Sequence, residues 1–212
     1  MTTLVPRDAG AAADLALFAT RVARYEAEAV IRVVADGTVA AFFAETPFDA
    51  LVVRALALAE PVTLDEVLEA GTLAARAVGE RAEVELPSPV PALRWTSSLP
   101  PRSGWTELAR LSGSDVRARV EAGIEEFRRR APELTEGSSR REGRTVLENL
   151  ADEIWDRELA GGVPLRLAHA AESYGFLGEG DVVLRGTGPW WRLDGPYGSV
   201  IARSGLSLFA LR

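Results

Sequence analysis

Five prolines fall within the short stretch from Leu86 to Arg102, and this stretch constrains what the 212-residue chain can fold into more than any other feature. Proline continues neither the interior of a helix nor a central strand, so the stretch is expected to be extended. We therefore predict two small domains, residues 1–88 and 103–212, joined by a connector at residues 89–102. A chain of this length can bury a core in each domain.

The composition excludes several classes of function. The chain has no Cys, which removes disulfides, thiolate catalysis and Cys-ligated zinc, and His169 is its only His. No apolar run approaches the roughly 20 residues that span a bilayer, and the N-terminus lacks the pattern of a signal peptide. We expect a cytoplasmic protein with no membrane contact, no metal and no cofactor.

Every one of the 24 basic residues is Arg, a pattern that indicates the codon usage of a GC-rich genome. Residues 1–100 carry eight Arg against 14 acidic residues, and residues 101–212 carry 16 against 17. The net charge of −7 gives the chain no electrostatic footprint for nucleic acid, which depends on neutralising phosphates.

In the first half, apolar spacing and turn signals predict a helix, three strands, a helix and a short strand. Asp36-Gly37 lies between two apolar runs and predicts a two-residue hairpin turn. Thr63 to Glu66 has the pattern of a capping box that opens a helix. The predicted helices are residues 11–25 and 63–78, and the predicted strands are residues 29–34, 38–43, 48–57 and 82–86.

The second half is expected to contain helices followed by strands. Pro132 is expected to end the first helix, and the polar segment that follows, residues 133–143, is interpreted as a loop. Gly186 to Gly188 has the pattern of a hairpin turn rather than a phosphate loop. The predicted helices are residues 115–130, 146–159 and 164–175, and the predicted strands are residues 182–185, 190–193, 199–202 and 206–209. The fold class is therefore α+β, with two small layers of antiparallel sheet and helix.

The order of helices and hairpin in the second half resembles that of a winged helix, which makes a transcription regulator one alternative. Residues 106–113 also have the small-residue and Gly spacing of a helix-turn-helix. Against this, the would-be recognition helix carries only Arg166 as a cation beside His169 and Glu172, and nearby Arg runs are interleaved with acidic residues. We expect nucleic acid not to be the partner.

Two groups of residues are candidates for a site. Asp152 and Asp156 share a helix face at i,i+4 spacing and could meet His169 as a metal or acid–base cluster. An ordinary solvated face is the more common reason for such a pattern, and the repeated Glu-x-x-His motif of two-helix metal sites is missing. This cluster supports only the weakest alternative, an enzyme.

The second group is aromatic. Trp190 and Trp191 are adjacent on a predicted strand, so their rings point to opposite faces of the sheet. One ring can join the core, and the other can face solvent or a partner, with Tyr197 nearby. Trp is enriched at interface anchors, and we take Trp190, Trp191 and Tyr197 as the candidate interface.

Several segments together resemble a group of uncharacterised proteins from high-GC actinobacteria. They are Glu153-Ile154-Trp155-Asp156-Arg157, Val163-Pro164-Leu165-Arg166, Ala168-His169-Ala170-Ala171, Gly175-Phe176-Leu177, Tyr197-Gly198-Ser199-Val200 and Arg21-Val22-Ala23-Arg24, the last leading into Ala29-Val30-Ile31-Arg32. The resemblance covers most of the chain and implies no activity, ligand or catalytic residue.

No coherent catalytic set emerges from these residues. The leading hypothesis is therefore a non-enzymatic binding or scaffold protein that acts through protein–protein contacts and forms a homodimer by strand edges and the Trp190–Tyr197 region. The transcription regulator and the metal-dependent or acid–base enzyme remain as alternatives.

Overall fold

The computed structural model describes residues 2–8, 10–77, 83–137 and 139–204. The chain divides into two compact units, Met1–Pro101 and Arg102–Arg212. Each unit combines helices with antiparallel strands, so the predicted α+β class is confirmed. The strand predicted at residues 206–209 lies outside the described residues.

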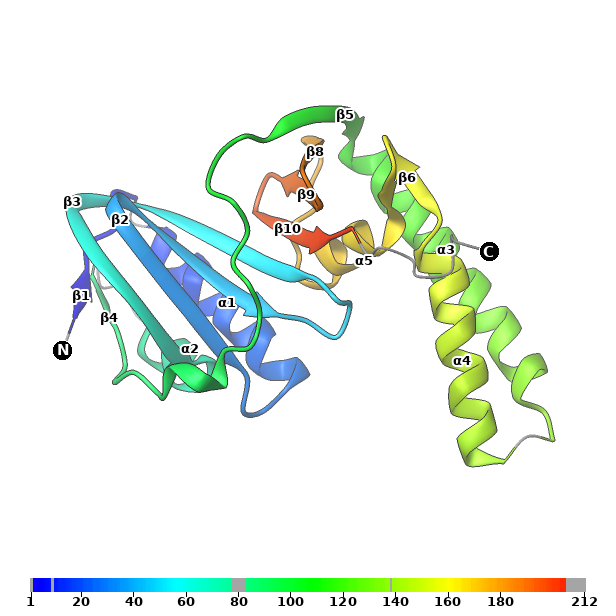
Figure 1. Cartoon of the computed structure of the whole chain (residues 1–212). Helices are drawn as coiled ribbons and strands as arrows, with labels where there is room; N and C mark the ends of the chain where they lie inside the picture. Colours follow the sequence, from blue (N-terminus) through cyan, green and yellow to red (C-terminus); the bar gives the residue numbers. More distant parts are fainter. Residues whose placement is uncertain (1, 9, 78–82, 138, 205–212) are drawn as a thin grey trace. The chain divides into compact units, whose positions relative to one another are not determined.

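The first unit is built on two long paired strands, β2 (Val30–Glu45) and β3 (Leu51–Glu69). Helices α1 (Ala11–Tyr25) and α2 (Ala70–Ala77) lie on one face of this pair (Figure 1). The apolar stripe of α1, with Leu15, Phe18 and Val22, is buried as its spacing predicts. The short strands β1 (Thr3–Leu4) and β4 (Val84–Glu85) pair with each other.

The hairpin predicted at Asp36-Gly37 is wrong. The residues on either side do not pair with each other, because both belong to β2 and both pair with β3, as Val34 does with Asp65 and Phe43 with Val53. The register shifts between Gly37 and Val39, and Gly37 has a φ of 76°. Figure 1 shows both strands changing direction sharply there. The Asp-Gly signal therefore marks a bulged bend within a strand.

The helix predicted to open at Thr63 is also wrong. Residues 63–69 continue β3, and α2 begins only at Ala70. Pairing with β2 places Leu68 opposite Ile31, and both side chains are fully buried. A capping box can be satisfied only within one helix turn, whereas pairing along β2 satisfies the whole backbone of the segment, so the longer-range structure prevails.

The Pro-rich segment packs on the first unit. It contains a single 3-10 turn, η1 (Ala92–Arg94), and the Val90 amide donates to the Val67 carbonyl at 2.8 Å. Trp95 is 8% exposed and clusters with Leu51 and Val67. The Glu45 carboxylate accepts hydrogen bonds from the Ser97 amide and from the Thr96 hydroxyl and amide, and these bonds lower the pKa of Glu45 against the effect of its partial burial.

The second unit contains a four-stranded antiparallel sheet in the order β10-β9-β8-β5. Its strands are β5 (Thr106–Ser112), β8 (Asp181–Thr187), β9 (Trp190–Gly195) and β10 (Gly198–Arg203). The turn predicted at Gly186 to Gly188 does join β8 to β9, and Gly188 has a φ of 50°. The helix-turn-helix start predicted at residues 106–113 is wrong, because β5 occupies most of it and pairs with β8.

Three helices accompany this sheet: α3 (Gly113–Thr135), α4 (Arg140–Trp155) and α5 (Leu165–Ser173). A short β6 (Glu158–Ala160) and β7 (Val163–Pro164) pair lies between α4 and α5. Pro132 sits inside α3 rather than ending it, so the polar segment is mostly helical. Leu159 belongs to β6, not to the second helix. Because β5 precedes the helices and pairs into the sheet, nothing in the described residues supports a winged helix.

Candidate interaction site

The predicted polar cluster of Asp152, Asp156 and His169 is accounted for by contacts between helices. Arg166 of α5 donates to Asp156 at 2.7 Å and to Asp152 at 3.1 Å, so the two aspartates hold an arginine. Glu172, three residues after His169, pairs with Arg117 of α3 at 3.3 Å. Across the described ranges, no group of three or more His, Asp or Glu side chains is arranged to hold a metal ion.

His169 packs against an aromatic ring. Its imidazole stacks on Trp155 of α4, with 3.9 Å between ring centroids and 15° between the ring planes. Trp155 also fills the space above Gly123 of α3, where an added Cβ would lie 2.8 Å from the ring. The Trp155 ring therefore joins all three helices of the unit. Burial of His169 lowers the pKa of its imidazole to about 4, so the ring is neutral at pH 7.

We predict that the His169 imidazole titrates near pH 4 in the folded protein, instead of at its ordinary value of about 6.5. As the pH falls from about 6.5 through about 4, the unfolded chain takes up a proton that the folded chain excludes, so the free energy of unfolding decreases. Because this His is the only one in the chain, its Hε1 resonance gives the titration directly by NMR. A midpoint near 6.5 would contradict the prediction, and His169→Phe should remove this pH dependence while keeping the ring packed.

The predicted aromatic interface is divided between core and surface. Trp190 is 9% exposed and lies under the guanidinium of Arg203, 5.3 Å from the ring centroid. Trp191 is half-buried, as expected for a ring on the opposite face of the strand. Tyr197, in the turn between β9 and β10, is 54% exposed. Among the three, Tyr197 is the side chain with the most surface available to a partner.

The same sheet holds a compact polar network. The Asp194 carboxylate accepts from Arg185 at 2.7 Å, from Arg192 at 2.6 Å and from the Ser199 hydroxyl at 2.5 Å. Arg192 also lies 5.7 Å above the ring of Trp105. The contacts tie three neighbouring strands together and leave two arginines around one carboxylate. Their role is to fix the sheet surface next to Trp190.

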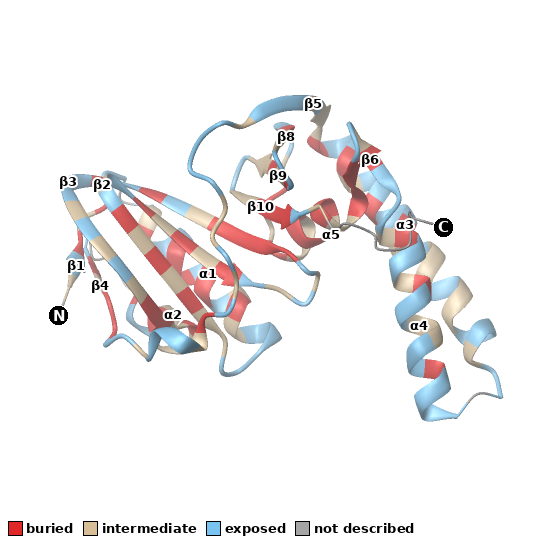
Figure 2. Cartoon of the chain, in the orientation of Figure 1, coloured by how far each residue is buried: buried red, intermediate tan, exposed pale blue. Residues whose placement is uncertain are grey.

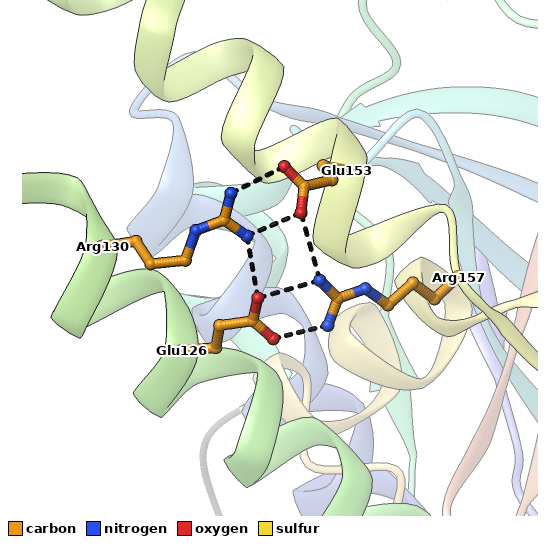
Figure 3. Close-up of polar contacts among 4 residues, drawn as sticks. All are labelled: Glu126, Arg130, Glu153 and Arg157. Atoms are coloured by element: carbon orange, nitrogen blue, oxygen red, sulfur yellow. Dashed lines mark hydrogen bonds and ion pairs between the residues drawn. The ribbon is translucent and has the colours of Figure 1, made fainter. Parts of the chain in front are cut away.

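A ring of alternating charges joins α3 to α4 (Figure 3). Arg130 donates to Glu153 at 2.6 and 2.8 Å and to Glu126 at 2.8 Å. Arg157 donates to Glu126 at 2.9 Å and to Glu153 at 3.3 Å. Hydrogen bonds from Arg157 and Arg130 lower the pKa of Glu126 to about 2. A hydrogen bond from Arg130 also lowers the pKa of Glu153. The ring is solvent-exposed, so it sets the alignment of the helices more than their stability.

The outer edges of two strands are a feature that the sequence did not reveal. In the first unit β2 is paired with β3, and in the second unit β5 ends the sheet beside β8. Within the described residues each has a strand neighbour on one side. On either side of the bulge in β2, buried and partly buried residues alternate, and Val39 at the bulge is 50% exposed (Figure 2). Such edges present backbone donors and acceptors for pairing with another chain.

The arrangement of strands and helices resembles the sliding-clamp fold. The sliding clamp of Caulobacter crescentus DNA polymerase matches 96% of this chain with a TM-score of 0.54 and 14% identity. The DNA polymerase III β subunit of Thermotoga maritima matches 95% of this chain with a TM-score of 0.54 and 11% identity. The sliding clamp of Pseudomonas aeruginosa also matches 95% of this chain, with a TM-score of 0.51 and 12% identity. The match covers 64–65% of those chains, so this chain spans less than two thirds of their length.

Residues 100–207 match the family model described as Domain of unknown function (DUF8185), and the chain belongs to this family. Residues 1–97 match a second model, Domain of unknown function (DUF8010). A sequence comparison with curated proteins gives no match. The resemblance to a family without an assigned activity is therefore confirmed. Among the described residues, no helix combines the length and apolar character needed to cross a membrane.

Sequence reasoning missed the open edges and the charge ring for different reasons. The i,i+4 pairs Glu126–Arg130 and Glu153–Arg157 are visible in the sequence and predict contacts within one helix each. Their alignment across two helices depends on how α3 packs against α4. The edge of β2 was hidden because the Asp-Gly signal divided one strand into two.

Proposed function

We propose that this protein is a non-enzymatic scaffold that acts through protein–protein contacts and forms a homodimer through strand edges. One observation carries the proposal: β2 is 16 residues long, and within the described residues it is paired on one side only. The bulge at Gly37 bends this edge, and the straight runs on either side of it, residues 30–36 and 39–45, still offer backbone donors and acceptors to another chain. The likeness of the fold to that of DNA polymerase sliding clamps supports a scaffold.

The polar residues with the best claim to chemistry have structural partners. Asp152 and Asp156 hold Arg166, and the Asp194 network joins three strands. These contacts favour a binding protein over the enzyme alternative. The exposed Tyr197 is a second contact for the dimer, after the edge of β2.

Nucleic acid is the second candidate, because the structural neighbours are named as DNA polymerase clamps. The net charge of −7 argues against it, since affinity for a duplex depends on the number of phosphates that Arg or Lys neutralise. We therefore favour a protein partner over DNA.

The dimer is tested by sedimentation equilibrium and native mass spectrometry of the full chain. The wild-type protein is expected at twice the mass of one chain, and Val39→Arg is expected to shift the equilibrium to monomer, because an exposed charge on a strand edge opposes pairing. Val39→Thr, which keeps a β-branched side chain and adds no charge, is the matched control and should remain dimeric. A wild-type monomer throughout the micromolar range, or a dimeric Val39→Arg, would refute dimerisation by this edge.

A further inference from the structure

We propose that the groove between the end of α3 and the start of α4 binds an acidic segment of a partner protein that also carries apolar side chains. This inference rests on the proposed scaffold function and names the partner class and the binding site. The groove is shallow and open to solvent, and its volume is about 520 Å³, which is enough for several side chains. It is lined by Thr135, Ser139, Arg140, Gly143, Arg144, Leu147, Glu148 and Ala151.

The floor of the groove is apolar. Gly143, Leu147 and Ala151 recur at four-residue spacing, so they form one stripe along α4. Gly143 is buried. Leu134, beside the groove residue Thr135 in the chain, is 42% exposed. Figure 2 shows mostly exposed residues around this stripe at the far end of α3 and α4. Apolar side chains of a ligand would be removed from water there.

Arg140 lines the groove and Arg141 follows it in the chain, and the described residues neutralise neither cation. Arg140 and Arg141 occupy the first turn of α4, and neither has an ion-pair partner among the described residues. Arg144, one turn on, pairs with Glu148 at 2.9 Å. The N-terminus of a helix is the positive end of its dipole, so cations there are unfavourable until an anion binds.

The acidic residue closest to these arginines in sequence is already engaged. Ser139 and Glu142 form a capping box, with the Ser139 amide donating to the Glu142 carboxylate at 3.0 Å and the Ser139 hydroxyl accepting from the Glu142 amide. The bonds from Ser139 lower the pKa of Glu142. Carboxylates of a ligand are the groups that complement Arg140 and Arg141, because an Arg guanidinium binds a carboxylate with two parallel hydrogen bonds.

The charge ring of Figure 3 aligns α3, which supplies Thr135 to the groove, with α4, which supplies most of the groove residues. Glu126 and Arg130 lie on α3, Glu153 lies on α4, and Arg157 follows it, so the ring braces the helices about one to two turns from the groove. A groove whose walls are already aligned binds with less loss of conformational entropy than one that must form on contact. The ring therefore supports binding without touching the ligand.

The composition of the hairpin favours a peptide over a nucleic acid. Residues Gly113–Thr135 and Arg140–Trp155, with Glu136 between them, contain eight Arg and ten acidic residues. The arginines of these helices without an ion pair among the described residues are therefore few: Arg119, Arg128 and Arg129 on α3, and Arg140 and Arg141 at the start of α4. A phosphate backbone needs an extended basic surface, whereas an acidic peptide with apolar side chains needs a short basic rim and an apolar floor.

The experiment is a selection from a random 16-residue peptide library displayed on phage, with the full chain as target. Winning peptides are resynthesised with a fluorophore, and their Kd values are measured by anisotropy. The test variant is Arg140→Glu/Arg141→Glu. The control is Arg128→Glu/Arg129→Glu, which makes the same change of charge at exposed arginines about 10 Å along α3 from Thr135, at 1.5 Å per residue. A mixed-sequence DNA duplex is measured in parallel.

We expect the winners to combine Asp or Glu with Leu, Ile or Phe, and to bind the test variant at least tenfold more weakly than the wild type and the control. Absence of enrichment, basic or neutral winners, equal loss in both variants, or tighter binding of the duplex would each overturn the proposal. Val39→Arg leaves the groove intact, so it should bind the peptides as the wild type does. Peptide binding and dimerisation can therefore fail separately.

Discussion

Trp95→Ala is expected to lower the free energy of unfolding of the first unit by about 3–5 kcal/mol, as large-to-small changes of buried aromatic residues do. Trp95 lies in the Pro-rich segment, yet it is 8% exposed and packs with Leu51 and Val67. Its indole Nε1 donates to the Ser97 carbonyl at 2.6 Å. The substitution removes the apolar contacts and this bond together, and it leaves a cavity beneath the segment. Urea unfolding followed by far-UV circular dichroism measures the loss.

The control for this substitution lies on the same segment. Leu93 is 83% exposed, so Leu93→Ala should change the free energy of unfolding by no more than about 0.5 kcal/mol. Hydrogen exchange should show faster exchange of the Val90 amide in Trp95→Ala and not in Leu93→Ala. Equal stability of Trp95→Ala and wild type would mean that the segment is a loose connector and not part of the first unit.

Gly113→Ala is expected to destabilise the second unit by about 3 kcal/mol, at the upper end of the usual cost of overpacking, because the obstructing atoms belong to the backbone. A Cβ at Gly113 would lie 2.0 Å from the Gly178 carbonyl oxygen and 2.7 Å from that of Gly180. The Gly113 amide donates to the Gly180 carbonyl at 3.0 Å, so relief of the clash also breaks a hydrogen bond. The start of α3 must then move away from Gly178 and Gly180, which precede β8.

Gly180→Ala is the matched control, because the nearest atom to a Cβ there is Pro196 Cβ at 3.9 Å, an ordinary contact. Urea unfolding should separate the two variants clearly, and hydrogen exchange should place the loss of protection in the first turns of α3. Gly113→Ala with wild-type stability would show that this close approach of backbones is not required by the fold.

The two units illustrate where sequence patterns fail. Thr63 to Glu66 and Ser139 to Glu142 have the same capping-box spacing, and only the second begins a helix. The difference lies outside the motifs: β2 supplies hydrogen-bond partners for residues 63–69, and α4 has no such strand beside it. In the same way, residues 106–112 pair with β8, a strand about 70 residues later in the chain, so no local pattern distinguishes β5 from a helix start.

For the candidate sites too, the sequence singled out residues, and the structure showed what those residues contact. The sequence identified His169, Asp152, Asp156 and the tryptophans as unusual, and the structure gives each of these a packing or ion-pair role. The sequence could not show that Arg166 would bind both aspartates, or that the Trp155 ring would stack on the His169 imidazole. The groove at Arg140 was equally hidden, because it depends on how the end of α3, at Thr135, packs beside α4.

The sequence by itself determined the α+β class, the apolar faces of α1 and of the strands, the turn between β8 and β9, and the absence of cysteine chemistry. Those features depend on the spacing of side chains within about ten residues of one another. The tertiary structure alone decided the length of β2 and β3, the strand at residues 106–112, the packing of the Pro-rich segment and the open edges. Each of these depends on backbone hydrogen bonds or apolar contacts between residues far apart in the chain, and such partners are chosen by the energy of the whole fold rather than by local preference.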